Sequence, residues 1–389
     1  MPLPRCFGWI LVSSFAALCA ALPLNAVELD HPGPGPYAVG STNFEVREPA
    51  EGVAMFDYLN GKATAQQLLY ISDLLVSPDS VPTVQVPVPV DPKFGRWSGK
   101  SLPVVLYVVY PTTAGNDRPA YTFPYRETGD NVFTHMQRPG EKPLIATADR
   151  KHPLIVYSGG YNTHGLWHLE ELKFLASHGY IAVDIFHADN RGPGFVGNLA
   201  LRALTLRAVT DYMLAHPDFG PAIDPDRIGV SGASAGAHAV LSSLGGFDPR
   251  SQHEGQPHPR IKAGFAVVPF MGARLGMWPF GIDAWLFGED HAGLRAVKTP
   301  FFAVYADKDQ SVAPANVESG LRALAGWRGA VRVKDETHLL SKGAGEDARA
   351  WELLFFNAWL RDDPAARAQL ERGSSIKGGG ADQRVEPWK

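Results

Sequence analysis

"RIGVSGASAGAHAVL", residues 227–241, joins a short apolar strand to a helix through a run of small residues. Gly232, Ser234 and Gly236 match the pattern G-x-S-x-G, whereas Ser231 lacks the second glycine. A sharp strand-to-helix turn needs glycine on both sides of its central serine, because larger side chains would clash across the turn. The stretch therefore predicts a nucleophile at Ser234 and a core position for Ser231. The alternative is a small-residue turn that serves only to pack a helix closely on a sheet.

Short apolar strands alternate with helices from residue 153 onward. Strands are expected at "PLIVYSGG", "YIAVDIF", "IKAGFAVVPF", "FFAVYA" and "AVRVK". Helices are expected at "HLEELKFLASHG", "NLALRALTLRAVTDYMLAHP", "AGAHAVLSSLGG" and "EDARAWELLFFNAWLR". This alternation is typical of an α/β fold with a mainly parallel twisted sheet and helices on both faces.

The composition divides the chain into four segments. A leader of residues 1–26 precedes an N-terminal extension with edge strands and loops (27–150), a core (151–372) and a tail (373–389). In the extension, "LPVVLYVVY" predicts a strand, while the prolines of "VPTVQVPVPVDP" restrict that segment to a sheet edge or an extended loop. The tail is Gly-rich and polar, so we expect it to be disordered.

The leader has the layout of a secretory signal peptide. Arg5 is followed by an apolar run and then by small residues up to Ala26, where we expect cleavage. The apolar run is short for a transmembrane helix, although an uncleaved membrane anchor is the alternative. A secreted or periplasmic protein without stable membrane insertion is therefore predicted. Cys6 and Cys19 both lie in this leader, so the mature protein has no cysteine nucleophile and no cysteine-ligated metal.

Charge and motif content argue against several classes of partner. The net charge is −4 and no run of Lys or Arg is present, which argues against nucleic acid as a partner. His164 and His168 have the spacing of one helical face, but no acidic third ligand is evident, so no metal is expected. The absence of G-x-G-x-x-G after a strand and of a P-loop indicates no nucleotide cofactor.

A serine hydroxyl is a weak nucleophile unless a base accepts its proton and an acid orients that base. On an α/β sheet with this type of turn, the acid and then the histidine follow the serine from the ends of later strands. "FFAVYADKDQSVAP" supplies Asp307 and Asp309 after one strand, and "AVRVKDETHLL" supplies His338 after the next. The order is therefore that of a catalytic triad, with two candidates for its acid.

From about residue 153 to residue 361 the chain resembles an α/β-hydrolase. It is similar in particular to the dienelactone-hydrolase-like and platelet-activating-factor-acetylhydrolase-like serine esterases. The matching pieces are "PLIVYSGGY", "FLASHGYIAVDI", "IDPDRIGVSGASAG", "GLRAVKTPFFAVYADKDQSVAP" and the loop of His338. The resemblance implies a triad of Ser234, Asp309 and His338, with Asp307 as the fallback acid.

The resemblance also implies an oxyanion hole made by the N–H groups of Ala235 and Tyr161. Relatives commonly carry "SHG" in the loop after the strand "PLIVYS", whereas this chain has "SGGY", with Gly159 in place of the histidine. Trp167, Trp278 and Trp285 are the candidate substrate-binding residues. Ordinary packing is the alternative for each of these aromatic side chains.

Together these features predict a secreted serine hydrolase that cleaves carboxylic esters through an acyl-enzyme on Ser234. Its partner would be a small-molecule or lipid ester, and no cofactor is needed. Two alternatives remain. One is a serine peptidase similar to prolyl oligopeptidase, although no repeated propeller blades precede the core. The other is a catalytically inactive binding protein on the same fold.

Overall fold

The computed structural model describes residues 27–48, 70–124, 131–147, 150–187, 189, 192–249, 257–272, 274–275, 282–283, 286–378 and 382–385. The expected leader lies outside these residues. No helix in the described ranges combines the length and the apolar character needed to cross a membrane.

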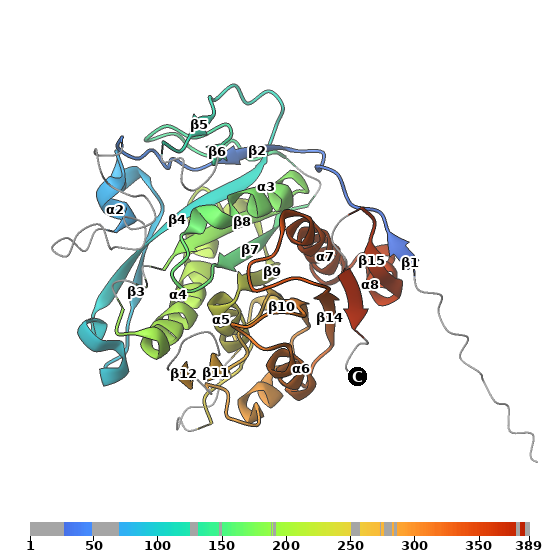
Figure 1. The fold of residues 1–389 in the computed structure, drawn as a ribbon. Coiled ribbons are helices and arrows are strands. Elements are labelled where there is room, and N and C mark those ends of the chain that lie inside the picture. Colours follow the sequence, from blue (N-terminus) through green and yellow to red (C-terminus); the bar gives the residue numbers. More distant parts are fainter. Residues whose placement is uncertain are drawn as a thin grey trace, which may run out of the picture.

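A mainly parallel sheet organises the described residues (Figure 1). Its six central strands are mutually parallel and lie in the order β14-β13-β10-β9-β7-β8, and β4, β2, β3 and β16 add antiparallel edges. The strands are β2 (Ala38–Ser41), β3 (Thr83–Pro87), β4 (Ser101–Thr112), β7 (His152–Ser158), β8 (Ile181–Phe186), β9 (Ile223–Ala233), β10 (Ile261–Val267), β13 (Phe301–Ala306), β14 (Arg328–Val333) and β16 (Asp382–Val385). The predicted α/β class with a mainly parallel sheet is confirmed.

Helices cover both faces of the sheet. On one face lie α3 (Leu169–Ser177) and α7 (Lys342–Leu360), and on the other lie α4 (Phe195–Ala215), α5 (Ala235–Ser243) and α6 (Pro314–Ala323) (Figure 1). The apolar side chains of each group pack in a separate core layer. Along β7, Leu154 and Val156 point to the α4 side, whereas Ile155 and Tyr157 point to the α3 side. Burial on both faces explains why this strand is an almost continuous apolar run.

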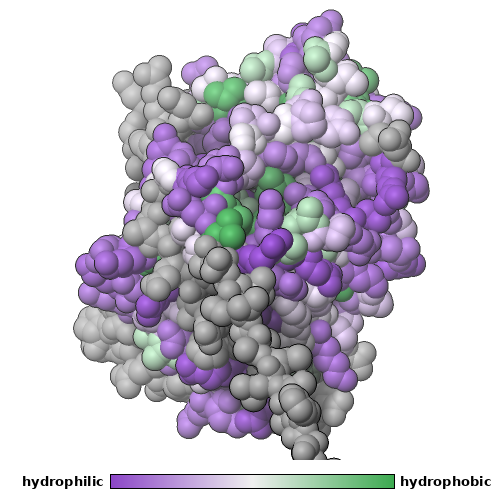
Figure 2. Space-filling view, turned by 90° about the vertical axis from the view of Figure 1, so that its right-hand side faces the viewer, coloured by the Kyte–Doolittle hydropathy of each residue, from purple (hydrophilic) through white to green (hydrophobic). Residues whose placement is uncertain are grey.

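Smaller elements complete the description. The remaining helices are α2 (Ile71–Leu74) and α8 (Pro364–Arg372), and the short 3-10 helices are η1 (Pro78–Ser80), η2 (Pro92–Trp97), η4 (Gly165–His168), η6 (Gly220–Ala222) and η7 (Ala292–Ala296). Three strand pairs lie outside the central sheet: β1 (Val27–Leu29) with β15 (Gly373–Ile376), β5 (Tyr121–Thr122) with β6 (Val132–Phe133), and β11 (Arg274–Leu275) with β12 (Ile282–Asp283). The side of the molecule that carries α8, β1 and β15 is mainly hydrophilic, with separate small hydrophobic spots (Figure 2).

The structure agrees with the prediction for the proline-containing segment of the extension but differs from the prediction for the tail. The proline-containing segment forms β3, which pairs only with β4, as its prolines predict for an edge position. The expectation of a disordered tail is wrong for residues 373–376 and 382–385. β15 pairs with β1, and β16 pairs with the outer edge of β14. Ile376 of β15 is buried in the core. The open edge of β14 presents unpaired backbone N–H and C=O groups, and these can order the more polar β16.

Candidate active site

Ser234 occupies a strained turn between β9 and α5. Its φ of 50° and ψ of −115° lie outside the regions that residues with a side chain normally adopt. The backbone is held there by the N–H of Ser234, which donates to Val267 O at 3.0 Å, and by its C=O, which accepts from Phe270 N–H at 3.0 Å. These two bonds join the turn to the segment that follows β10.

The glycines that flank Ser234 are required by close backbone contacts. A Cβ atom on Gly236 would lie 1.8 Å from Ser158 O, and one on Gly232 would lie 2.8 Å from the same oxygen. Neither distance is compatible with a side chain. The G-x-S-x-G pattern therefore reflects the packing of this turn against the end of β7.

A chain of hydrogen bonds connects the three residues of the expected triad. His338 Nε2 lies 3.0 Å from Ser234 Oγ, and His338 Nδ1 lies 2.7 Å from Asp309 Oδ2. The Asp309 side chain is only 2% exposed, and its Oδ1 accepts from the N–H groups of Ser311 at 2.8 Å and Val312 at 2.9 Å. With Nδ1–H donating to the carboxylate, Nε2 is the ring nitrogen that can accept a proton from the serine.

The sheet order brings these residues together. Ser234 follows β9, Asp309 follows β13 and His338 follows β14, and the three strands are parallel members of one sheet with β10 between the first two. Their carboxyl ends therefore lie at the same edge, where ligands bind in open α/β sheets.

Three other Asp, Ser and His residues that lie near the expected triad in the sequence have different surroundings. His338 Nδ1 is hydrogen-bonded to Asp309 and not to Asp307, whose Oδ1 is buried without a hydrogen-bond partner in the described part of the chain. Ser231 is fully buried in β9 next to Glu352 of α7, as its predicted core position requires. His238, four residues after Ser234, is buried and stacks on Phe287.

The N–H groups of Tyr161 and Ala235 are available for an oxyanion. Within the described residues neither of them donates a hydrogen bond. The loop of Tyr161 passes close to the serine, since a Cβ atom on Gly160 would lie 3.6 Å from Ser234 Cβ. Two unpaired N–H groups beside a nucleophile are the arrangement that stabilises a developing oxyanion.

Arg202, which the sequence reasoning missed, fixes the loop that carries Tyr161. This α4 side chain is 1% exposed and donates to Gly159 O at 2.5 Å and to Gly160 O at 2.6 Å. Thr163 Oγ1 adds a third donor, at 2.8 Å from Gly160 O. In a trans peptide the C=O and N–H point in opposite directions, so holding Gly160 O turns the N–H of Tyr161 away from Arg202.

The charge of Arg202 is balanced by Asp189. The two side chains form an ion pair in which both are almost fully buried, and Asp189 Oδ2 also accepts from Asn162 N–H at 2.8 Å. A single arginine on the buried face of the helix "NLALRALTLRAV" was the available sequence signal, since a buried arginine needs a specific partner. A second polar pair, Ser158 Oγ with His187 Nε2 at 2.8 Å, lies at the start of the same loop.

A cavity of about 520 Å³ opens beside Ser234 and His338. Its other lining residues are Tyr157, Gly160, Tyr161, Asn162, Thr163, Trp167, His168, Glu171, Ala233, Val267, Val268, Leu339, Leu340, Gly345 and Ala348. Trp167 is therefore at the cavity, as expected of a substrate-binding residue, and is 48% exposed. Trp278 and Trp285 lie outside the described residues.

One side of this cavity is polar, and we call it the polar wall: Tyr157, His168 and Glu171. Glu352 is fully buried behind this wall, beside Glu171. His168 Nδ1 lies 3.3 Å from Glu171 Oε2. Burial raises the pKa of Glu171, but the hydrogen bond to His168 and the charge of that ring outweigh burial and hold the pKa below its usual value. Burial, together with the neighbouring charge of Glu171, raises the pKa of Glu352 well above its usual range. These shifts favour the ionised form of Glu171 and the protonated form of Glu352.

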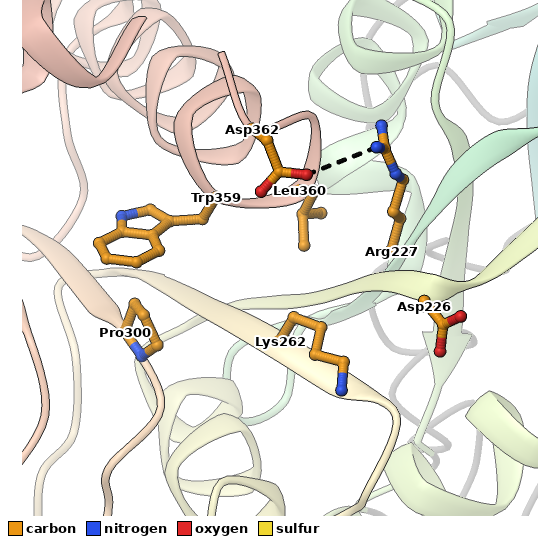
Figure 3. A pocket seen from close by; sticks show the side chains of 7 residues that line it. All are labelled: Asp226, Arg227, Lys262, Pro300, Trp359, Leu360 and Asp362. Atoms are coloured by element: carbon orange, nitrogen blue, oxygen red, sulfur yellow. Dashed lines mark hydrogen bonds and ion pairs between the residues drawn. The ribbon is translucent and has the colours of Figure 1, made fainter. Parts of the chain in front are cut away.

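A second cavity, of about 450 Å³, lies at the opposite end of the strands (Figure 3). It is lined by Asp226, Arg227, Lys262, Pro300, Trp359, Leu360 and Asp362. Arg227 turns toward Asp362, at 3.4 Å (Figure 3). Asp226 pairs with Arg260, which does not line the cavity, at 2.9 Å. No serine or histidine is among these seven lining residues, so this cavity has no counterpart of the Ser234–His338 pair at the carboxyl edge.

The histidine pair noted in the sequence flanks a 3-10 turn and does not form one α-helical face. His164 precedes η4 and His168 ends it. Burial lowers the pKa of His164 to about 3, so its ring is neutral. Among the residues that the structure describes, no three His, Cys, Asp or Glu side chains are grouped as metal ligands would be.

Comparison of the chain with models of known protein families and with curated proteins found no match in either set. The function must therefore be argued from the site itself.

Proposed function

We propose that this protein is a serine hydrolase that cleaves carboxylic esters, built on an α/β-hydrolase fold. The observation that carries the proposal is the chain of hydrogen bonds from Ser234 through His338 to the buried Asp309, at a strained turn beside a cavity. Support for the fold comes from the parallel central strands, the antiparallel β4 at one side and the order serine, acid, histidine along the chain.

In the proposed reaction, Ser234 Oγ attacks the ester carbonyl while His338 Nε2 accepts the hydroxyl proton. Asp309 holds the histidine ring in the required tautomer and stabilises its charged form. The N–H groups of Tyr161 and Ala235 bind the oxyanion, and the protonated His338 then gives its proton to the leaving alcohol. Water, deprotonated by His338, releases the acid from the acyl-enzyme.

Activity on a substrate panel is the direct test. The purified protein without residues 1–26 is expected to hydrolyse p-nitrophenyl esters and to be labelled at Ser234 by a fluorophosphonate. Faster turnover of peptide anilides than of esters would favour the peptidase alternative. Labelling of Ser234 without turnover of either class would indicate a binding protein. The absence of both labelling and turnover would refute the proposal.

We also propose that the protein is exported, on the strength of the signal-peptide layout of residues 1–26. Expression with the native leader is expected to give a product outside the cytoplasm that begins at Val27. N-terminal sequencing of that product checks the cleavage position, and an intact leader in a membrane fraction would identify an uncleaved anchor.

A further inference from the structure

The polar wall is the part of the catalytic cavity that the proposed hydrolysis leaves unused. The rest of the cavity lining is largely apolar, with Trp167, Val267, Val268, Leu339 and Leu340 among its residues. Such a lining by itself would suit a plain hydrocarbon group. A carboxylate at the edge of an apolar cavity is costly unless donors satisfy it, and His168 reaches only one of the two oxygens of Glu171. The other oxygen suits a polar group on the ligand.

Glu171 is the member of the polar wall that a ligand can reach. Its side chain lines the cavity and is 16% exposed, whereas Glu352 is fully buried behind it. Only Oε2 of Glu171 contacts His168. A carboxylate has about four acceptor positions, so Glu171 retains capacity for a donor from the cavity.

The charge balance of the wall favours a neutral donor. Burial lowers the pKa of His168, but its hydrogen bond to Glu171 outweighs burial and raises that pKa above the usual value. In its protonated form the His168 ring, 3.3 Å from Glu171 Oε2, offsets the charge of this carboxylate. An ammonium group would lose its hydration on entering an apolar cavity without meeting a net negative charge.

Tyr157 provides a second, independent indication. It lines the same cavity, its ring packs 4.4 Å from the His168 ring, and its buried hydroxyl has no hydrogen-bond partner within the described residues. Buried hydroxyl groups are normally paired. A hydroxyl group on a ligand can both donate and accept a hydrogen bond, whereas an ammonium group can only donate.

We propose that the substrate is an ester that carries a free hydroxyl group, and that Glu171 selects it by accepting a hydrogen bond from that hydroxyl. The inference rests on the proposed ester hydrolysis at Ser234 and names its substrate class. Glu171 is thus a specificity residue and takes no part in bond breaking.

Matched ester pairs test this preference. In one arm, p-nitrophenyl esters of terminally hydroxylated acids with three, four and six carbons are compared with the alkanoyl esters of equal length. In the other, acetate monoesters of diols are compared with acetates of the corresponding alcohols, because the hydroxyl group can lie on either side of the ester. The hydroxylated member of at least one pair is expected to have a kcat/KM about 10- to 100-fold higher, the effect of a hydrogen bond to a charged acceptor.

Variants of α3 assign the preference to Glu171. Glu171→Gln is expected to reduce the preference to within about threefold while plain alkanoyl esters are still hydrolysed. Glu170→Gln, one residue away on a side chain that is 61% exposed and paired with Lys173, should keep the wild-type preference. If thermal unfolding shows that Glu171→Gln does not fold, Glu171→Asp, which shortens the carboxylate by one methylene, is expected to weaken the preference in the same direction.

The outcomes separate this inference from the proposed function. Turnover of esters without any hydroxyl preference in either arm would overturn the inference alone. A stronger preference for the matching amino esters would also overturn it, in favour of a cationic substrate. No ester turnover and no labelling of Ser234 would overturn both.

Discussion

Ser234 and Ser231 lie three residues apart, yet only Ser234 has a base within reach. Its Oγ lies 3.0 Å from His338 Nε2, while Ser231 is fully buried in the strand. Ser234→Ala is expected to lower kcat/KM for p-nitrophenyl acetate on the order of 10⁴-fold or more, because it removes the nucleophile. Ser231→Ala is the matched control and should retain most of the activity. Equal losses in the two variants, measured by initial rates, would mean that the nucleophile is misassigned.

The two carboxylates after β13 also differ in what they contact. Asp309 is hydrogen-bonded to His338 Nδ1, whereas Asp307 Oδ1 has no hydrogen-bond partner among the described residues. Asp309→Asn is expected to reduce kcat by about 10⁴-fold, since an amide favours the wrong tautomer of the histidine. Asp307→Asn should change kcat little. The reverse pattern in steady-state kinetics would move the acid to Asp307.

Arg202 acts through the loop of Tyr161 and is a positioning residue. Arg202→Lys keeps the charge beside Asp189 but cannot donate to both Gly159 O and Gly160 O in the same fork geometry. Because the oxyanion forms only in the transition state, we expect kcat to fall by roughly 10- to 100-fold with little change in KM.

The control for this variant is Arg207→Lys, on the same helix, which should alter neither constant. A parallel loss of thermal stability without the selective loss of kcat would show that Arg202 is only structural.

At the scale of the element, the close contact between α5 and the end of β7 sets the position of the turn. Gly236→Ala would place Cβ 1.8 Å from Ser158 O, so the helix must shift. We expect a loss of more than about 2 kcal/mol in the free energy of unfolding, together with loss of activity. Urea denaturation followed by circular dichroism measures the change in the free energy of unfolding.

A glycine inside another helix provides the contrast. Gly345 in α7 has no atom within 4 Å of an added Cβ, so Gly345→Ala should stabilise the protein by about 0.5–1 kcal/mol through helix propensity. Similar destabilisation of both variants would show that Gly236 is not specifically required.

Elements differ in how far the sequence predicts them. The strands with continuous apolar runs and the long helices α4 and α7 were predicted, because burial on one or both faces leaves a periodic pattern. α8 was not predicted, although Asp363 before Pro364 is a recognisable helix start in which the carboxylate accepts from Ala365 N–H at 2.8 Å. β16 leaves no such signal, since the edge of β14 orders it through backbone hydrogen bonds.

For the whole molecule, a buried carboxyl in β8 links stability to pH. Burial raises the pKa of Asp184 from 3.8 to about 7, an effect that the nearby His168 only partly offsets. Tyr107 donates to this carboxyl at 3.2 Å, and Glu171 lies near it. Between pH 4 and pH 7 the unfolded chain ionises this group while the folded protein keeps it protonated, so stability falls as pH rises.

Asp184→Asn removes that titration and keeps the shape of the side chain. The free energy of unfolding of the wild type, relative to this variant, is expected to fall by about 3–4 kcal/mol between pH 4 and pH 8. Urea denaturation of both proteins at several pH values measures it. A difference that is independent of pH would contradict the raised pKa.

The sequence alone determined the features that are local or periodic. Apolar strands alternating with helices predicted the mainly parallel sheet, and G-x-S-x-G between a strand and a helix predicted the turn at Ser234. Both patterns are formed by residues that are close together along the chain. The order of serine, acid and histidine predicted the triad but left the acid open between Asp307 and Asp309. The tertiary structure decided that choice, since only Asp309 lies beside His338.

Tertiary structure also decided the contacts between distant segments. Arg202 meets Gly159 and Gly160 across about 40 residues of chain, and Glu352 of α7 meets Glu171 of α3 behind the cavity. Such pairs depend on which helices cover the same face of the sheet and on the exact packing between them. A pattern of residues along the chain can indicate that a side chain is buried. Only the tertiary structure determines which other side chain or backbone group it contacts.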